Sequence, residues 1–197
     1  MKKKLVGFII LALFTLAIPA YAGAPLEVVK ANLNKALEVL NDPKLKADSG
    51  KEIKTQKLRA IYREMVNEVE FSRRTLGRHW NQFTPAQRAE FVDLFEQVLE
   101  KAYVDQIFTY TDERIEYTRE NMLTDTMAEV QTKIITSSKE IPVFYRLSKR
   151  DGQWRVYDVV VENVSMVQNY RTQFNDILAK NKPEHLLDVL RKRVKEK

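Results

Sequence analysis

The chain has 197 residues, of which 44% are hydrophobic and 30% are charged, and its formal net charge is +6. This length and apolar content suit a single domain with a sizeable core. Cysteine is absent and there are only two histidines, which excludes a disulfide framework and a thiolate nucleophile and argues against a zinc or histidine-rich metal site. The charge pattern contains nothing typical of a nucleic-acid-binding arm.

The first 22 residues have the features of an export signal. Residues 2–4 are lysines, residues 5–18 are apolar, and Ala20-Tyr21-Ala22 provides the small residues that a signal peptidase requires. The apolar run is short for a membrane span, although an uncleaved signal anchor is the alternative. We therefore expect residues 1–22 to be a signal peptide and residues 23–197 to be one exported domain. Cleavage removes three lysines and no acidic residue, which leaves a net charge of +3.

Two amphipathic helices are predicted at the start of the mature chain. In residues 25–40, leucines and a valine recur at three- and four-residue spacing, which predicts a helix with one apolar face. Asn41-Asp42-Pro43 ends that helix. A second helix carries Ile53, Leu58, Ile61, Tyr62, Met65 and Val66, and residues 71–77 form a short, turn-broken helical segment.

The longest apolar stripe follows a strong helix start. Thr84 can cap, Pro85 suits the first helical position, and Gln87 completes a capping box. The stripe runs through Phe91, Leu94, Phe95, Val98, Ala102 and Tyr103 to Ile107. We interpret it as a core face that packs against a sheet and can also line a cavity.

After Tyr110 the apolar period changes from 3.6 to 2, which predicts strands at 114–119, 127–137, 141–149 and 153–161. Short turns separate them, so they form an antiparallel meander. Two further helices are predicted at 169–180 and 183–194. The fold class is therefore α+β, with helices packed on one face of a strongly curved, roughly four-stranded antiparallel sheet. Such a sheet can leave an interior wider than its own side chains fill, which is one route to a ligand cavity.

The last predicted strand contains a carboxylate that needs a partner. Simple alternation places Arg155, Tyr157, Val159 and Val161 on one face and Trp154, Val156, Asp158 and Val160 on the other. Neither face is plainly polar, so we expect a central strand covered on both sides. Asp158 then lies on an otherwise apolar face, where an unpaired carboxylate would be costly to desolvate.

Two stretches together resemble a known family. Residues 71–95 contain Phe71, Leu76-Gly77, Trp80, Thr84, Gln87, Phe91 and Phe95, and residues 154–174 read WRVYDVVVENVSMVQNYRTQF. With the export signal, these motifs resemble the MlaC (toluene-tolerance) family over most of the mature chain, and the second motif is the more specific. The sequence departs from the family pattern at Asn163, where glycine is expected, and at Asn181-Lys182-Pro183, where Gly-x-Asp usually begins the last helix.

The resemblance implies a carrier that is not an enzyme and needs no cofactor other than phospholipid as cargo. Members have a nuclear-transport-factor-like, cone-shaped sheet with a deep apolar cavity for acyl chains. They are periplasmic proteins of Gram-negative bacteria and shuttle phospholipid between an outer-membrane lipoprotein complex and an inner-membrane ABC transporter with an MCE-domain subunit. A shuttle of this kind is expected to be a monomer.

With that resemblance, the apolar faces become candidates for the lipid-binding surface. Burying a methylene is worth about 0.8 kcal/mol, so an acyl chain of roughly a dozen methylenes gains about 10 kcal/mol only when it is enclosed. The candidate lining combines the 91–103 stripe with the last strands and the helix that follows them: Phe91, Leu94, Phe95, Val98, Tyr103, Val143, Tyr145, Tyr157, Val159, Val161, Val164, Met166, Tyr170, Phe174 and Leu178. Each of these residues could equally be ordinary core.

Two interpretations of Arg171 remain open from the sequence. It could bind a lipid phosphate, or it could form a buried structural pair with Asp158, which we favour because Asp158 needs a partner. Two other function classes also remain. A cavity-bearing isomerase- or dehydratase-like enzyme would use Asp158 as its general base, with Tyr145 or Tyr157 as donors, and a periplasmic chaperone would use the cavity for apolar side chains. No metal site and no catalytic triad is expected.

Overall fold

A computed structural model describes residues 24–45, 50–108 and 113–196. The predicted signal peptide therefore lies outside the described residues. Within these ranges, four α-helices precede the sheet: α1 (Pro25–Asn41), α2 (Lys51–Met65), α3 (Glu68–Leu76) and α4 (Pro85–Phe108), with 3-10 turns η1 (Pro43–Leu45) and η3 (Gly77–Gln82) between them. The strands are β1 (Arg114–Thr124), β2 (Met127–Ile135), β3 (Glu140–Arg150), β4 (Gln153–Val161) and β5 (Val164–Ser165), and α5 (Met166–Leu178) and α6 (Pro183–Lys195) follow.

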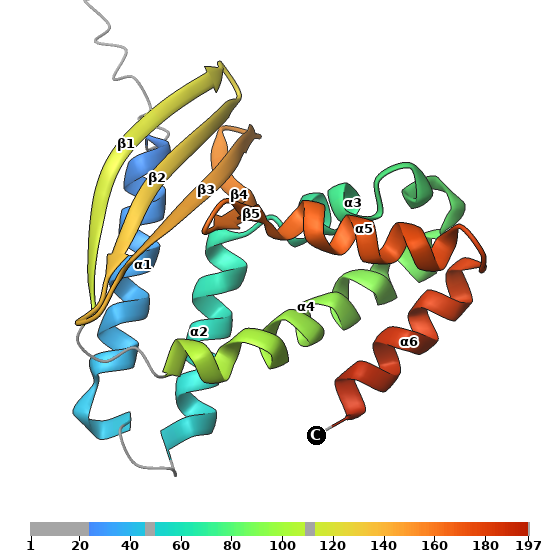
Figure 1. Ribbon diagram of the computed structural model, residues 1–197, viewed down its shortest axis with the longest axis horizontal. Coiled ribbons are helices and arrows are strands. Elements are labelled where there is room, and N and C mark those ends of the chain that lie inside the picture. Colours follow the sequence, from blue (N-terminus) through green and yellow to red (C-terminus); the bar gives the residue numbers. More distant parts are fainter. Residues whose placement is uncertain (1–23, 46–49, 109–112, 197) are drawn as a thin grey trace, which may run out of the picture.

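The predicted α+β class and antiparallel meander are confirmed. In the described part of the chain the sheet has five strands in the order β1-β2-β3-β4-β5, every neighbouring pair antiparallel. The sheet curves around α1, whereas α4, α5 and α6 extend away from it (Figure 1). No helix among the described residues is both long enough and apolar enough to cross a membrane.

The structure adds one strand that periodicity did not predict. The two-residue strand β5 pairs with the end of β4 through Val161 and Val164. Between them, Glu162 and Asn163 have φ of 49° and 67°, so both central residues of this hairpin turn are left-handed. Asn tolerates that conformation better than most non-glycine residues, which explains how Asn163 stands where the family pattern has glycine.

Local turn chemistry sets the start of α4, as predicted. Gln87 donates its main-chain N–H to Thr84 Oγ1 at 3.2 Å, and Thr84 donates its N–H to Gln87 Oε1 at 2.9 Å, which completes the capping box. Just upstream, Gly77 ends α3 with φ 53° and ψ −124°. This backbone conformation is strained for any residue with a Cβ, so the glycine is required there.

A β-bulge in β4 corrects the predicted strand faces. Arg146 pairs with Asp158 but Leu147 pairs with Val156, so Tyr157 is an extra residue in β4. Because directly paired residues share a face, Val156 lies on the same face as Val159, and Asp158 lies on the opposite one. The prediction that Val156 and Asp158 share a face is wrong, since strict alternation fails at a bulge.

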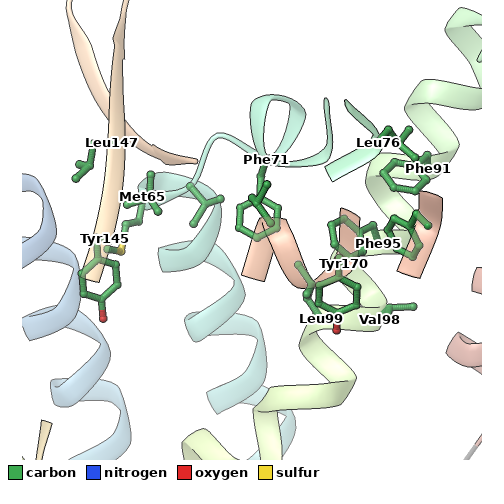
Figure 2. Packing of buried hydrophobic residues seen from close by; sticks show 14 of the residues in the cluster. Met65, Phe71, Leu76, Phe91, Phe95, Val98, Leu99, Tyr145, Leu147 and Tyr170 are labelled. Carbon is green, nitrogen blue, oxygen red and sulfur yellow. The ribbon is translucent and has the colours of Figure 1, made fainter. Parts of the chain in front are cut away.

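The buried core has two parts that meet at Phe71. Near the sheet, Leu147 and Tyr145 pack with Met65 at the end of α2; farther away, Phe91, Phe95 and Tyr170 form an aromatic group between α4 and α5 (Figure 2). The rings of Phe71 and Phe95 lie 5.9 Å apart, so Phe71 joins the two parts. The end of α2 is also tied to the sheet, because Asn67 donates its N–H to the Val156 carbonyl at 2.8 Å.

Candidate functional site

A pocket of about 450 Å³ lies between the sheet and helices α2 and α4. Its volume falls in the range of about 300–1,000 Å³ that small-ligand sites usually have. The sheet side is formed by aliphatic side chains that share one face, since Ile134 pairs with Ile141 and Val143 pairs with Val161. The other apolar lining residues are Leu58, Tyr62 and Val66 from α2 and its end, Phe71 from α3, Leu99, Tyr103 and Ile107 from α4, and Val159, Val164 and Met166.

The polar lining lies mainly on the facing sides of α2 and α4. Arg59 donates from Nε and Nη2 to the two carboxylate oxygens of Glu100, each at 2.7 Å. One turn away on each helix, Arg63 donates in the same way from Nε and Nη2 to the two carboxylate oxygens of Glu96, each at 2.9 Å. Bidentate guanidinium–carboxylate pairs have well-defined geometry. These two ion pairs therefore bridge α2 and α4 along one wall of the pocket.

Burial perturbs two groups beside this wall. The pKa of Tyr62 is raised by burial, and the neighbouring carboxylates of Glu68 and Glu96 raise it further. Burial also raises the pKa of Glu68, again with a contribution from Glu96. Glu68 Oε1 is buried without a hydrogen-bond partner and lies 3.7 Å from the Arg63 guanidinium. Burial therefore desolvates Tyr62 and Glu68 beside the wall, which disfavours the charged form of each group.

Some of the residues proposed from sequence line this pocket and others do not. The lining includes Tyr103, Val143, Val159, Val161, Val164 and Met166. Tyr145 pairs with Val159 on the same face of the sheet and is buried next to the pocket. The remaining proposed residues belong to the core or pack against it: Phe91, Leu94, Phe95, Val98, Tyr157, Tyr170, Phe174 and Leu178.

Four aromatic residues of the proposed set, Phe91, Phe95, Tyr170 and Phe174, contact one another. The ring of Phe95 lies 4.9 Å from that of Tyr170 and 5.3 Å from that of Phe174, both edge-on, and Phe91 lies 5.6 Å from Phe174. Edge-to-face packing of this kind stabilises a core beyond its area burial. These rings hold α5 against α4, and Phe95 also contacts Phe71, which lines the pocket.

Sequence reasoning gave α2 no part in the pocket. Yet Leu58 and Tyr62 are one turn apart, as are Thr55 and Arg59, so one helical face supplies both apolar and charged lining. The amphipathic pattern of α2 is visible in the sequence, but the element against which its apolar face packs is not. Which helix covers which part of a sheet is decided by tertiary packing.

Asp158 and Arg171 do not form the pair that we favoured from the sequence. Asp158 is 2% exposed and accepts hydrogen bonds from Arg146 at 3.2 Å, Ser165 Oγ at 2.7 Å and the Val167 N–H at 3.0 Å. It therefore anchors the first turn of α5, where a carboxylate also interacts favourably with the helix dipole. Alternation with Val159 and Val161 places Asp158 on the face opposite the pocket, beside the cross-strand Arg146, and the expected pair with Arg171 does not form.

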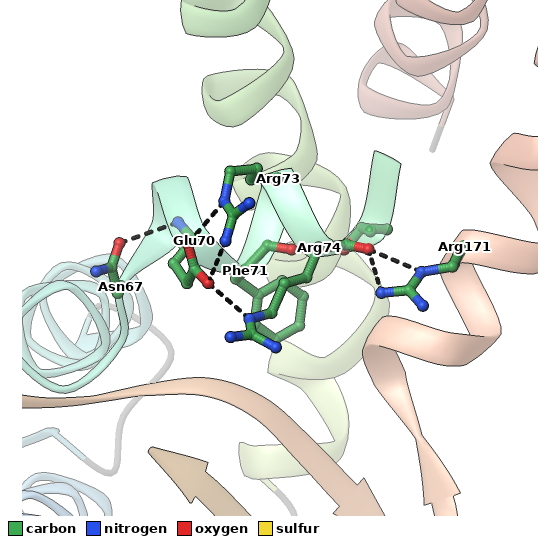
Figure 3. A network of polar contacts seen from close by, with 7 residues as sticks. Asn67, Glu70, Phe71, Arg73, Arg74 and Arg171 are labelled. Atoms are coloured by element: carbon green, nitrogen blue, oxygen red, sulfur yellow. Dashed lines mark hydrogen bonds and ion pairs between the residues drawn. The ribbon is translucent and has the colours of Figure 1, made fainter. Parts of the chain in front are cut away.

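Arg171 instead binds the main chain of α3. Its Nε and Nη2 donate to the Arg74 carbonyl at 2.8 and 2.6 Å (Figure 3). That carbonyl belongs to the last turn of α3, where no intrahelical donor is available. Arg171 is not among the residues that line the pocket. Among the residues that the structure describes, no group of three or more His, Cys, Asp or Glu side chains could hold a metal ion.

The fold agrees with what comparison with known proteins shows. A family model described as MlaC protein matches residues 30–192, so the chain belongs to the MlaC family, and the resemblance seen in the motifs is confirmed. Two curated relatives match at 26% identity: the intermembrane phospholipid transport system binding protein MlaC of Haemophilus influenzae, over 54% of this chain and 52% of the relative, and the toluene tolerance protein ttg2D of Pseudomonas putida, over 50% and 46%. The chain thus spans about half the length of each curated relative.

A solved structure matches over a larger part of the chain. It is the phospholipid-binding protein from Ralstonia solanacearum in complex with a phospholipid, with a TM-score of 0.77 and 21% sequence identity. The match covers 87% of this chain and 97% of that protein. The two proteins therefore share their fold.

Proposed function

We propose that this protein binds phospholipid by its acyl chains in the pocket between the sheet, α2 and α4 and carries it through the periplasm. The observation that carries the proposal is the mostly aliphatic pocket of about 450 Å³ on the inner face of the sheet. Enclosing an acyl chain of roughly a dozen methylenes there is worth about 10 kcal/mol before the costs of ordering. Membership of the MlaC family and the fold shared with a phospholipid-binding protein support it.

The family suggests the partners and the compartment. The donor and acceptor would be an outer-membrane lipoprotein complex and an inner-membrane ABC transporter with an MCE-domain subunit. Residues 1–22 would direct export and be removed, which leaves one lipid-binding domain at 23–197. A monomer suits a carrier that must dock on two membranes in turn.

An enzyme is the weaker alternative, because its candidate general base faces away from the pocket. Asp158 accepts three hydrogen bonds that anchor β3 and α5, and it lies on the face of β4 opposite the pocket-lining Val159 and Val161. A general base must lie within hydrogen-bond reach of its substrate. We therefore propose a binding protein without catalytic activity.

Native mass spectrometry tests this proposal directly. The mature protein is purified from the periplasm without detergent, and bound lipid is extracted and identified. Phospholipid at a defined ratio is the expected result. A mass without cargo, unchanged after incubation with phospholipid vesicles under conditions in which a control carrier loads, would contradict the proposal. A chaperone would carry heterogeneous polypeptide at no fixed stoichiometry.

A further inference from the structure

The pocket has an apolar side and a charged side. The sheet contributes only aliphatic side chains, whereas the helices also contribute polar ones: Thr55 and Arg59 from α2, and Glu96 and Glu100 from α4. Charge buried among aliphatic groups without a partner is costly. A bound lipid is therefore oriented by the walls, with its tails against the sheet and its polar end against the helices.

The Arg59–Glu100 pair lies where the pocket meets solvent. The side chain of Arg59 is 40% exposed and that of Glu100 is 24% exposed, whereas Glu96, one turn away, is only 8% exposed. A partly exposed ion pair contributes little net free energy, because its two members also interact well with water. The Arg59–Glu100 pair can therefore open and exchange partners at small cost.

We infer that this pair is a head-group subsite selective for a zwitterionic phospholipid in which the phosphate stands next to a primary ammonium, an inference that rests on the proposed function. When the lipid binds, the Arg59 guanidinium leaves Glu100 and donates a bidentate pair of hydrogen bonds to the phosphate oxygens. Glu100, now free, accepts hydrogen bonds from the ammonium. One ion pair becomes two, and no charge is left without a partner.

An anionic head group that lacks an ammonium fits this subsite less well. Its phosphate still reaches Arg59, but Glu100 loses its cation and remains close to the phosphate. Like charges at a few ångströms repel, more strongly in a partly desolvated site than in water. Glu96 adds to the negative potential from one turn below, and its own partner, Arg63, is already engaged. The subsite therefore discriminates against phosphatidylglycerol.

The test measures head-group selection, with three variants. Lipid is loaded from detergent micelles that contain equimolar phosphatidylethanolamine and phosphatidylglycerol with the same acyl chains. The detergent is then removed, and the lipid ratio is measured by mass spectrometry. The wild type is expected to be enriched in phosphatidylethanolamine by about three- to fivefold, the size expected from one partly exposed ion pair. Glu100→Gln should lose the enrichment.

The control variant is on the same helix. Glu90→Gln removes the α4 carboxylate that pairs with Arg191 of α6, which is also an inter-helix Arg–Glu pair but lies outside the pocket. It should select as the wild type does. If Glu90→Gln and Glu100→Gln changed the ratio equally, selection would not come from the pocket wall and the inference would be overturned.

Arg59→Gln separates a head-group role from a bridging role. Without the Arg59 guanidinium, the total amount of bound lipid should fall, and bound phosphatidylglycerol should fall more than phosphatidylethanolamine. The ratio of phosphatidylethanolamine to phosphatidylglycerol should therefore rise, whereas in Glu100→Gln it should fall. If the pair only bridges α2 and α4, both substitutions should change the lipid ratio in the same direction. Full loading of all variants at the wild-type ratio would overturn the subsite and leave the carrier proposal standing. No lipid in the wild type would overturn both.

Discussion

Arg171 in α5 donates two hydrogen bonds to the main-chain oxygen of Arg74 in α3, at 2.8 and 2.6 Å. The arginine thereby satisfies a carbonyl that the end of α3 leaves without an intrahelical donor, and it places a positive charge at the negative end of that helix. The guanidinium also lies over the backbone turn at Gly77, where a Cβ would meet Arg171 Nε at 3.6 Å. The Leu76-Gly77 step and the Asn169-Tyr170-Arg171 step of the two motifs thus meet in one contact.

Arg171→Ala should therefore destabilise the protein without weakening lipid binding. Loss of two charge-assisted hydrogen bonds and exposure of an unsatisfied carbonyl should lower the free energy of unfolding by about 1.5–3 kcal/mol. The melting temperature of the lipid-free protein should fall, and lipid per protein at a permissive temperature should stay constant. Unchanged stability with reduced lipid retention would instead give Arg171 the head-group role.

Glu70 belongs to the same network of polar contacts (Figure 3), and its ionisation should make the stability of the fold depend on pH. Burial raises the pKa of Glu70, but hydrogen bonds from Arg73 and Arg74 outweigh it, so the net pKa lies below the ordinary value. The ionised carboxylate thus stabilises the fold above the pKa of an unfolded glutamate, and that contribution is lost as the pH falls through the lower folded-state pKa. Glu70→Gln should be less stable than the wild type at pH 7. Denaturant unfolding should show the difference shrinking below about pH 4; a difference independent of pH would contradict the assignment.

Val164→Glu should abolish lipid retention. Val164 lines the pocket yet is 57% exposed, so a glutamate can be accommodated in the fold while it places a charge where acyl chains are proposed to lie. The matched control is Val69→Glu on α3, because Val69 is 54% exposed and is not part of the lining. Both variants should have wild-type circular dichroism, and only Val164→Glu should purify without lipid. Equal retention by the two would place the cargo elsewhere.

Asp158→Asn tests the structural role of the carboxylate. Asn keeps the shape of the side chain but leaves Arg146 with one partner and weakens the anchor at the start of α5, which should cost about 3 kcal/mol. The exposed Asp151, in the β3–β4 turn, provides the control Asp151→Asn, which should change stability by less than about 0.5 kcal/mol. Wild-type stability of Asp158→Asn would mean that the three hydrogen bonds contribute little.

A substitution in the turn between β4 and β5 should stabilise the protein. Asn163 has φ of 67°, a conformation that L-residues adopt at a cost of roughly 1–2 kcal/mol and glycine at almost none. Because Asn bears only part of that cost, Asn163→Gly should raise the free energy of unfolding by about 0.5 kcal/mol, and Asn163→Ala should lower it by about 1 kcal/mol. Urea titration measures both, and the opposite order would rule out backbone strain at this turn.

Much of the secondary structure follows from local chemistry. The capping box at Thr84 fixed the start of α4, and the change of apolar period marked the beginning of the sheet. The helix that we expected at 169–180 begins earlier, at Met166, because Ser165 caps it by accepting the Gln168 N–H. β1 also continues to Thr124, beyond the predicted end at 119, since an edge strand with few buried residues has a weak apolar pattern.

The site could be predicted only in part, and the reason is geometric. Val159 and Val161 line the pocket on the face that alternation indicates, because they pair with Tyr145 and Val143 on one side of the bulge. Beyond the bulge, alternation reverses, so the face of Asp158 relative to Val156 could not be obtained by counting residues. The charged wall of α2 and α4 also could not be predicted from the sequence, because Arg59 and Glu100 are 41 residues apart and no local pattern connects them.

By itself, the sequence determined the α+β class, the meander and the positions of the helices, because hydrophobic period, caps and turn residues act over a few neighbouring positions. It also carried the motifs that mark the family. Only the tertiary structure decided which face of β4 looks inward, which helix closes the pocket, and which partner each buried charge finds. Those outcomes depend on contacts between residues that are distant in the chain, where packing and electrostatic pairing choose among several locally acceptable arrangements.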